Sequence, residues 1–184
     1  PNVAYDNPGT AADGLRTNDD FGMFNGATDR YDWKLVGKKE MYIPYNSYRL
    51  SDPKLKYNDL LRPGHLNQDL ARYELHRVWV VDATLKPGTS HIYARRTFYI
   101  DEDSWNVIMI DKYDGGQLWR FSEQHSENWY DVPMWFGTVE VHHDLQSRRY
   151  IAMGLRSEEK VIYEPIKRTS GDYTPQNLRN LGTR

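Results

Sequence analysis

The stretch RYELHRVWVVDATL, residues 72–85, decides the fold. Alternate residues of a β-strand point to opposite faces of the sheet, so these residues divide into two sets. One set is apolar along almost its whole length, and the other is apolar only at its centre, at Val78 and Val80. Fourteen residues would span about 45 Å, well beyond the usual length of about five or six residues. The stretch therefore predicts a long strand that bends or carries a bulge, as a curved sheet requires.

Other strand-like segments, separated by short turns, lie on both sides of this stretch. Asp114-Gly115-Gly116 is a strong hairpin signal, and Gln146-Ser147-Arg148 joins a further pair of strands. Short connections indicate an antiparallel meander, because parallel strands need long crossovers. The predicted fold class is mainly β, of the α+β type, with a curved antiparallel sheet and a few short helices. The expected strands are 31–45, 72–85, 91–100, 105–113, 117–129, 138–145, 149–155 and 161–163.

The chain divides into an irregular N-terminal arm, residues 1–30, and a single curved-sheet domain, residues 31–184. The arm is rich in Gly, Asn, Asp and Thr, which favour turns and irregular chain. Thr17 is the predicted N-cap of a short helical turn, with acidic residues near its positive end. The predicted anchors that hold the arm on the domain are Phe21, Met23 and Phe24.

Two further short helices are expected in the domain. Ser51-Asp52-Pro53 offers a cap followed by proline at the first helical position, which predicts a helix that ends near Leu61, before Pro63-Gly64. Thr174-Pro175 gives the same signal near the C-terminus, and Gly182 is the predicted end of that helix.

The composition excludes several classes of protein. The 184 residues suit one domain, and the 24 basic residues are scattered among 26 acidic ones, which argues against a nucleic-acid partner. The chain has no cysteine, so it has no disulfide, thiolate zinc site or cysteine nucleophile. No apolar run reaches the about 18–20 residues of a membrane span. The start Pro-Asn-Val, without initiator Met or signal peptide, indicates a processed protein or a domain of a longer one.

An acidic cluster, Asp101-Glu102-Asp103-Ser104, separates two of the predicted strands. A hairpin needs a reversal there, and Asp and Ser side chains bond nearby backbone amides in turns. Calcium is the alternative ligand for these carboxylates, but an EF-hand loop needs a later glycine and a distal Glu, and neither lies at the required spacing. The cluster is therefore interpreted as a turn.

Catalytic signals are weak. The chain lacks a Gly-x-Ser-x-Gly elbow, a His-Glu-x-x-His motif, a Gly-x-Gly-x-x-Gly motif and a phosphate loop. Glu140, His142 and Asp144 share one strand parity and could hold the metal of a hydrolase, as could Glu123 and His125. Alternation of polar and apolar residues is, however, the ordinary pattern of a half-buried strand. We therefore expect no enzyme activity, no catalytic residues, no metal site and no cofactor.

Large apolar side chains give the strongest positive signal. The chain has 14 Tyr and 6 Trp, and many of its aromatic residues must fill the core. Yet Val78 and Val80, with Ile108 and Ile110, make the second sheet face apolar too, so a helix, another sheet or a ligand must cover it. Apolar surfaces lined by aromatic residues and Met are where lipids are expected to bind. The predicted ligand-binding residues are Trp79, Val81, Trp105, Met109, Trp119, Phe121, Met134 and Trp135.

Four stretches resemble an uncharacterised family of Gram-negative proteins. They are DRYDWKLVGKKEMYIPYN (29–46), LRPGHLNQDLARYELHRVWVVDATLKPG (61–88), HIYARRTFYIDEDSW (91–105) and KYDGGQLWRFSE (112–123). The family is often labelled outer-membrane lipoprotein-sorting protein and belongs with the LolA and LolB lipoprotein carriers. The resemblance covers about residues 17–155 and brings no defined activity or site residue with it.

The resemblance implies a LolA/LolB-like fold, an incomplete antiparallel barrel closed by helices that holds acyl chains in its concave interior. It also implies a periplasmic protein of the Gram-negative envelope, working beside a membrane exporter. Members of the family are longer, so this chain resembles their C-terminal portion. The sheet edge that the missing strands would pair with would then favour a homodimer.

Two functions are therefore expected from the sequence. The first is a non-enzymatic periplasmic carrier or accessory protein that binds a lipid or another apolar ligand and is linked to lipoprotein or lipid transport to the outer membrane. The alternative is a structural or interaction module of an envelope transport complex, whose aromatic residues dock a protein partner.

Overall fold

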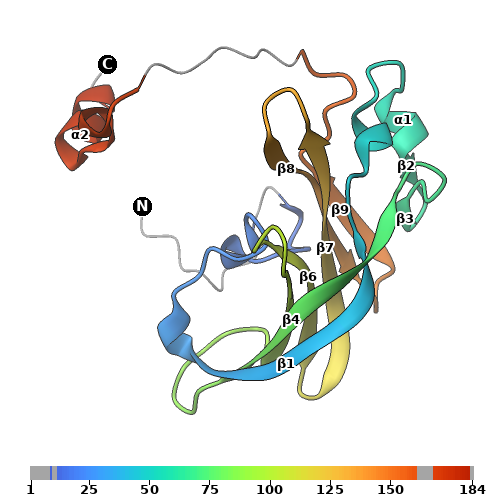
Figure 1. Cartoon of the computed structure of the whole chain (residues 1–184). Helices are drawn as coiled ribbons and strands as arrows, with labels where there is room; N and C mark the ends of the chain where they lie inside the picture. Colours follow the sequence, from blue (N-terminus) through green and yellow to red (C-terminus); the bar gives the residue numbers. More distant parts are fainter. Residues whose placement is uncertain (1–8, 10–11, 161–167, 183–184) are drawn as a thin grey trace.

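A seven-stranded antiparallel sheet forms the body of the protein (Figure 1). The computed structural model describes residue 9, residues 12–160 and residues 168–182. The order of strands in the sheet follows the order in the chain, and β1 and β9 are its two edges, so the sheet is not closed. The strands are β1 (Tyr31–Pro44), β4 (Tyr73–Leu85), β5 (Arg95–Asp101), β6 (Val107–Asp114), β7 (Gln117–Trp129), β8 (Met134–Asp144) and β9 (Arg149–Met153). The predicted fold class is confirmed.

Irregularities in pairing bend the sheet. The longest pair, β1 with β4, shifts its register between Leu35 and Gly37. The bulge expected within residues 72–85 therefore lies in the partner strand β1 instead. Gly37 has φ of 142°, a backbone conformation that a side chain would disfavour. Further register shifts occur in the pairs β5–β6, β6–β7 and β7–β8. β5 begins at Arg95 and not at His91, because the His91 side chain turns into a buried polar cluster of the arm.

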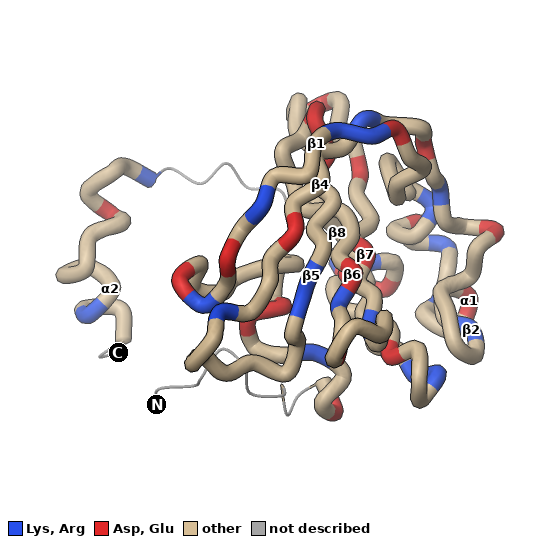
Figure 2. Tube along the Cα trace, turned by 90° about the horizontal axis from the view of Figure 1, so that it is seen from below, with Lys and Arg blue, Asp and Glu red and all other residues tan. Residues whose placement is uncertain are grey.

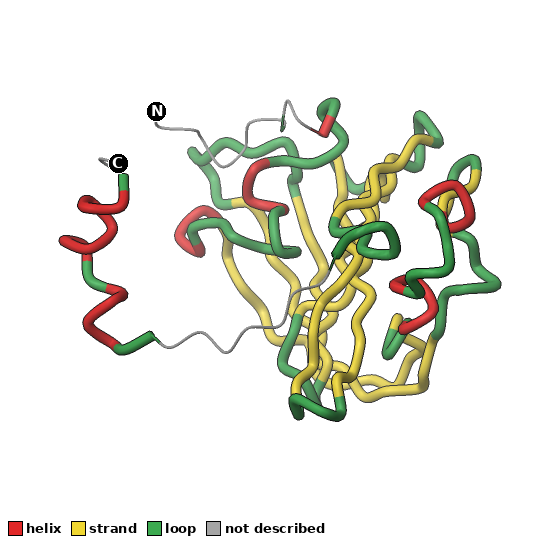
Figure 3. Tube along the Cα trace, turned by 90° about the horizontal axis from the view of Figure 1, so that it is seen from above, coloured by secondary structure: helices red, strands yellow, loops and turns green. Residues whose placement is uncertain are grey.

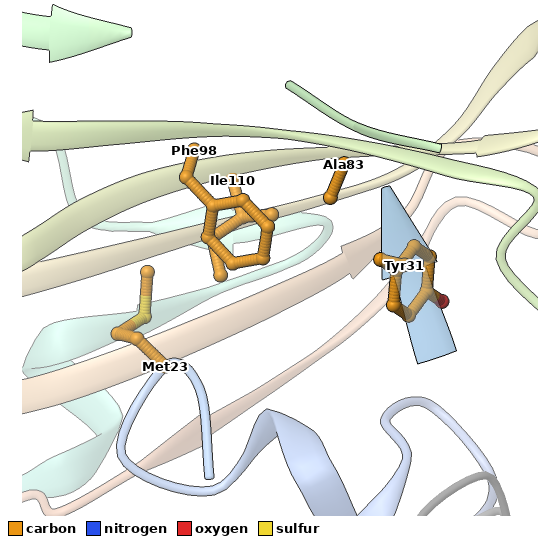
Figure 4. Close-up of a cluster of buried hydrophobic side chains, with 5 residues drawn as sticks. All are labelled: Met23, Tyr31, Ala83, Phe98 and Ile110. Carbon is orange, nitrogen blue, oxygen red and sulfur yellow. The ribbon is translucent and has the colours of Figure 1, made fainter. Parts of the chain in front are cut away.

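The N-terminal arm packs on one face of the sheet, which we call the arm face. Met23 of the arm and Tyr31, where β1 begins, meet Ala83, Phe98 and Ile110 in a buried cluster (Figure 4). The predicted helical turn is the 3-10 helix η2 (Asn18–Asp20), and its N-cap is Thr17 as expected. A second turn, η3 (Thr28–Arg30), leads into β1.

Two of the three predicted anchors of the arm are confirmed. Met23 is fully buried, and Phe24 packs against the same cluster. The prediction for Phe21 is wrong, because 57% of its surface is exposed and its ring lies under the guanidinium of Arg16. Phe21 is the C-cap of η2, where its backbone is extended.

The connection between β1 and β4 covers the opposite face of the sheet. Leu50, Leu60 and Leu66 pack on Val139 and Val141 of β8. Figure 3 shows the strands as a central layer with the helices of the arm and of this connection on different sides. Both faces are therefore covered in part by the chain itself, which accounts for the apolar residues on both strand parities.

The helix expected over residues 51–61 is only partly present. The connection contains η4 (Tyr48–Ser51), α1 (Tyr57–Leu60) and a small hairpin of β2 (Leu61–Arg62) and β3 (His65–Leu66). The Asp52 carboxylate accepts a hydrogen bond from the backbone N–H of Lys54 at 2.9 Å, so Asp52 forms a local turn in place of a helix cap. The prediction of one continuous helix is therefore wrong.

The second half of β1 curls toward the far strands of the sheet. Ile43 of β1 joins Val78, Ile108 and Met109 in a third buried cluster. Just beyond β1, the backbone N–H of Ser47 donates to the carbonyl oxygen of Ser126 in β7 at 2.6 Å. This contact gives the open sheet a partly closed, barrel-like shape at one end.

The C-terminal helix is confirmed. α2 (Pro175–Leu181) follows the 3-10 turn η5 (Ser170–Tyr173), and the Thr174 hydroxyl accepts a hydrogen bond from the backbone N–H of Asn177 at 3.2 Å. The strand expected at 161–163 lies outside the described residues. Among the described helices, none combines the length and the apolar character that a membrane span requires. Basic and acidic residues are interspersed along the trace (Figure 2).

We predict that Gly154→Ala destabilises the protein more than Gly64→Ala. Both glycines have positive φ, 77° and 83°, so the backbone strain of an added Cβ is about the same at each. A Cβ at Gly154 would also collide with the carbonyl oxygen of Thr138, whereas the space around Gly64 is open. Urea denaturation should show Gly154→Ala less stable than Gly64→Ala by about 1–3 kcal/mol, the usual cost of overpacking. Equal losses would contradict this packing.

Candidate functional site

A row of cations crosses the arm face. Arg96, Lys112 and Arg120 lie opposite one another on β5, β6 and β7. The arm brings two carboxylates to this row, with Asp19 2.5 Å from the Arg96 guanidinium and Asp20 2.7 Å from the Lys112 ammonium. The four paired side chains are almost fully buried. Since a buried charge is tolerated only when paired, these contacts hold the arm on the sheet.

The charges of this row determine the ionisation of the arm. Burial raises the pKa of Asp20, but the neighbouring charges of Lys112 and Arg96 outweigh it and hold that pKa far below its ordinary value. Burial likewise raises the pKa of Asp19, and the hydrogen bond from His91 and the charge of Arg96 lower it further than burial raises it. Both carboxylates are therefore ionised at neutral pH.

The Lys112 side of the pair behaves differently. Burial lowers the pKa of Lys112, and Asp20 only partly offsets this effect. The two pKa shifts disagree about the pair. The lowered pKa of Asp20 favours two charged groups, whereas the lowered pKa of Lys112 favours a neutral amine. We assign the ionised pair, because the two groups touch and removal of either charge would leave the other buried alone.

The polar row predicted on β8 continues from these ion pairs. The Lys112 ammonium donates to the Ser122 hydroxyl at 2.7 Å, and that hydroxyl lies 2.7 Å from Nδ1 of His142. Nε2 of His142 is 3.5 Å from Glu140. Asp144 is used elsewhere, 3.4 Å from Arg120 and bonded to backbone N–H groups of the β8–β9 turn. Glu140, His142 and Asp144 share a face but do not converge on one point.

Three of the predicted ligand-binding residues meet on the arm face. Trp79 and Val81 are alternate residues of β4 on the same face, and Trp105, in the turn between β5 and β6, stacks on Trp79. Val81 is paired with Leu35 of β1, which is 61% exposed. We call Leu35, Trp79, Val81 and Trp105 the tryptophan patch.

Ring stacking defines the centre of the tryptophan patch. The rings of Trp79 and Trp105 are stacked at 6.4 Å between centroids with an angle of 25°. The Lys38 ammonium lies 4.1 Å from the Trp79 ring, on the edge strand β1. Trp105 is 69% exposed and has φ of 57°, a conformation unusual for a bulky residue. Leu35 and Trp105 thus remain exposed, whereas Val81 packs against the buried cluster that contains Met23 of the arm.

The other predicted ligand-binding residues lie elsewhere. Met109, Phe121 and Trp135 belong to the third buried cluster, on the opposite face of the sheet. Trp119 packs edge-on against Tyr93 and under the guanidinium of Arg120. Met134 begins β8 and is partly exposed. The register shifts in β5–β6, β6–β7 and β7–β8 change which face a given residue reaches, and no sequence signal marked those shifts.

A buried carboxylate with two histidines lies on the opposite face. Oε1 of Glu123 is 3.6 Å from Nε2 of His125 and 3.6 Å from Nε2 of His143, and the Tyr73 hydroxyl donates to Oε2 at 3.2 Å. Burial raises the pKa of Glu123, but the hydrogen bonds and charges of the two histidines outweigh it and lower that pKa to about 2.

The acidic cluster between β5 and β6 forms a turn, as predicted. The backbone N–H and the hydroxyl of Ser104 both donate to Oδ2 of Asp101, at 2.8 and 2.6 Å. The turn also approaches β4, where His76, Asp101 and Asp103 offer three possible metal-ligand atoms within 4.8 Å of one another. In the part of the chain that the structure describes, no other group of histidines and carboxylates meets that criterion. Sequence reasoning missed His76, because its distance along the chain from the turn gave no signal.

The fold and the patch define an open, curved antiparallel-sheet protein with an uncovered apolar surface beside a clamped N-terminal arm. The chain belongs to the DUF1329 family, described as proteins of unknown function, which matches residues 1–179. The resemblance to an uncharacterised family is thereby confirmed. A similar protein is the uncharacterized protein PA3922 of Pseudomonas aeruginosa, 60% identical over 186 residues that cover 100% of this chain and 41% of that protein. The chain thus spans less than half the length of this relative.

Two solved structures are similar to the chain. One is a DUF1329 family protein from Desulfovibrio piger, with a TM-score of 0.47 and 14% identity over 75% of this chain and 44% of that one. The other is a putative outer membrane lipoprotein-sorting protein domain from Vibrio parahaemolyticus, with a TM-score of 0.47 and 9% identity over 98% of this chain and 58% of that one.

We predict that Asp20→Asn strongly destabilises the fold. The substitution leaves the buried Lys112 ammonium without its counter-ion, and breaking such a pair costs about 3–5 kcal/mol. The matched control is Asp29→Asn in the same arm, where the side chain is exposed and the change should stay within about 0.5 kcal/mol. Urea denaturation measures both. Similar stabilities of the two variants would show that the arm is not held by this pair.

Acid should weaken the fold in a defined window. The pKa of Glu123 falls from 4.5 to about 2 on folding, so its contribution is complete above about pH 5 and is lost as the pH falls toward 2. The shift of about 2.5 pKa units corresponds to about 3 kcal/mol of unfolding free energy. Asp19 and Asp20 act in the same direction. Glu123→Gln should flatten the pH dependence of unfolding between pH 5 and 2, and an unchanged slope would exclude this role of Glu123.

Proposed function

We propose that this protein is a non-enzymatic binding protein that holds a lipid or another apolar ligand on the arm face of its open sheet. The observation that carries the proposal is the tryptophan patch. Trp105 is stacked on Trp79 yet remains 69% exposed, next to the exposed Leu35. A contiguous apolar surface that stays exposed on a folded protein is a candidate binding surface.

The energetics of the patch favour an apolar ligand. Covering a large apolar side chain gains about 1.5–3 kcal/mol, and the patch offers several such side chains. The flat rings of Trp79 and Trp105 come from two different elements, so an acyl chain could lie along both. Lys38 lies at the patch and is paired with Glu102, which gives the apolar surface a polar border.

We propose no enzymatic role because the polar side chains that could act as catalytic groups are buried against the arm. Lys112, Ser122, His142 and Glu140 form a chain of contacts that could resemble catalytic machinery. These side chains are buried or nearly so, and the chain of contacts ends on Asp20 of the arm. A substrate would have to displace the arm to reach them.

The proposed location is the periplasm of a Gram-negative envelope, supported by the resemblance of the sequence to lipoprotein carriers. A carrier there would exchange its ligand with a membrane exporter or another envelope protein. The unpaired outer side of β1 or of β9 could pair with a second copy and give a homodimer. A nucleic-acid partner is not proposed, because the net charge is −2.

The second candidate function is a structural or interaction module without a ligand of its own. It is favoured by β1, an edge strand of 14 residues whose side chains Leu35 and Val36 are largely exposed. An edge of this length invites pairing with another strand. The partner would be another part of a longer protein or an envelope component that covers the tryptophan patch.

We expect a stoichiometric lipid in organic extracts of the natively expressed protein, detected by lipid mass spectrometry. Trp105→Ala should lower the affinity for a pyrene-labelled hexadecanoic acid at least about tenfold, since it removes an exposed ring worth roughly 1.5–3 kcal/mol when covered. Tyr130→Ala is the control, because Tyr130 is 80% exposed and lies outside the patch.

The two candidate functions separate clearly in this experiment. A protein that contains no lipid and does not bind the labelled fatty acid would contradict the carrier function. If Trp105→Ala also weakened a complex with the remaining part of the longer relative, the interaction-module function would be favoured. Loss of thermal stability in Trp105→Ala equal to that of a core variant would show that the patch serves folding. A 69% exposed ring is expected to leave stability almost unchanged.

A further inference from the structure

One histidine and two aspartates converge where β4 meets the turn between β5 and β6. Nδ1 of His76 is 2.9 Å from Oδ1 of Asp101 and 3.5 Å from Oδ2 of Asp103. Two ligand atoms on a tetrahedral zinc ion, each about 2.0–2.1 Å from the metal, lie about 3.3 Å apart. The two separations from His76 are close to that value, and all three ligand atoms lie within 4.8 Å of one another, so side-chain movements would bring them onto one ion.

The second ring nitrogen of His76, Nε2, also has a partner. Nε2 lies 3.4 Å from Oε2 of Glu74, and Glu74 is held in turn by an ion pair with Arg72. Without an ion, Nδ1 carries a proton that it donates to Asp101. With an ion bound, that proton would be displaced, and a proton on Nε2 directed at Glu74 would leave the lone pair of Nδ1 for the metal. The Tyr45 ring packs on the imidazole at 4.3 Å between centroids. A carboxylate on the remote nitrogen is the usual support of a metal-binding histidine.

The negative charges of Asp101 and Asp103 are not fully neutralised by neighbouring basic side chains. Glu102, between the two aspartates, is paired with Lys38 and Arg77. Asp103 has a side chain that is 74% exposed, and within the described residues its ion pair is with His76 alone. The fully buried Asp101 is held in place by Ser104. The group therefore presents net negative charge, which favours a cation.

An open pocket gives an ion access to this group. The pocket has a volume of about 290 Å³, and His76 and Asp103 form part of its wall. Its remaining lining residues are Glu40, Leu75, Arg77 and Glu102. One side of the group is thus fixed by the sheet and the other is accessible to solvent, which leaves room for water as a further ligand.

We propose that His76, Asp101 and Asp103 bind a divalent transition-metal ion, with Zn²⁺ as the best match. An imidazole nitrogen with carboxylate oxygens is a ligand set typical of zinc and its neighbours. Calcium and magnesium prefer oxygen ligands alone, so they fit the group less well. This site stands on its own geometry and does not depend on the proposed carrier function.

The ion would connect two parts of the fold. His76 belongs to β4, whereas Asp101 and Asp103 belong to the end of β5 and its turn. Trp105 follows directly in that turn and supplies half of the stacked pair in the tryptophan patch. A bound ion therefore steadies the segment that presents Trp105.

Calorimetric titration of the tag-free, metal-stripped protein with zinc chloride at neutral pH tests the site. We expect one ion per chain. Asp103→Asn should weaken binding at least about tenfold, and Glu74→Gln about 10–100-fold through the orientation of His76. Asp103 is exposed, so its variant should keep the wild-type circular dichroism and melting temperature. His65→Gln, at an exposed histidine of β3, is the control and should bind zinc like the wild type.

Four outcomes of this titration would contradict the proposed zinc site. No heat of binding for the wild type at millimolar zinc would remove it, as would equal zinc affinity in Asp103→Asn and the wild type. Loss of binding in His65→Gln would assign the ion to another place. If calcium bound as tightly as zinc in the same titration, the transition-metal assignment would be wrong.

Discussion

Two buried ion pairs between the arm and the sheet are the constraint on which the rest of the structure depends. Asp19 and Asp20 meet Arg96 and Lys112 away from water, where each charge would be very costly alone. The sheet therefore cannot keep its cationic row buried without the arm, and the arm brings Met23 with it into the apolar cluster beside that row. Polar pairing thus determines where the arm lies, and apolar burial supplies much of the stability.

The position of the arm determines which part of the sheet stays uncovered. The arm covers the region around Phe98 and Ile110, and the connection between β1 and β4 covers β8 on the opposite face. The part of β1 and β4 around Trp79 is left between them, with Trp105 stacked above it. The same short turn carries Trp105 and the two aspartates that face His76. The tryptophan patch and the proposed ion site therefore share this turn.

The candidate site was only partly predictable from the sequence. Trp79, Val81 and Trp105 were expected to line one surface and they do meet, because strand alternation and a short turn are local properties. Met109, Phe121 and Trp135 were expected beside them but lie on the opposite face. Each bulge adds one residue to a strand, so the residues after it point to the opposite face from the one that simple alternation predicts. No sequence pattern marked the positions of these bulges. His76 was invisible for a different reason, since it meets Asp101 only through strand pairing.

The sequence by itself determined the class of fold, the order of the strands, and the caps of the N-terminal turn and the C-terminal helix. These depend on residue alternation, turn residues and caps such as Thr17 and Thr174, which act within a few residues of the chain. Only the tertiary structure decided which charges are buried together and which apolar residues remain exposed. Those outcomes depend on contacts such as Asp20 with Lys112, far apart in the chain, whose energy comes from the removal of water when the segments meet.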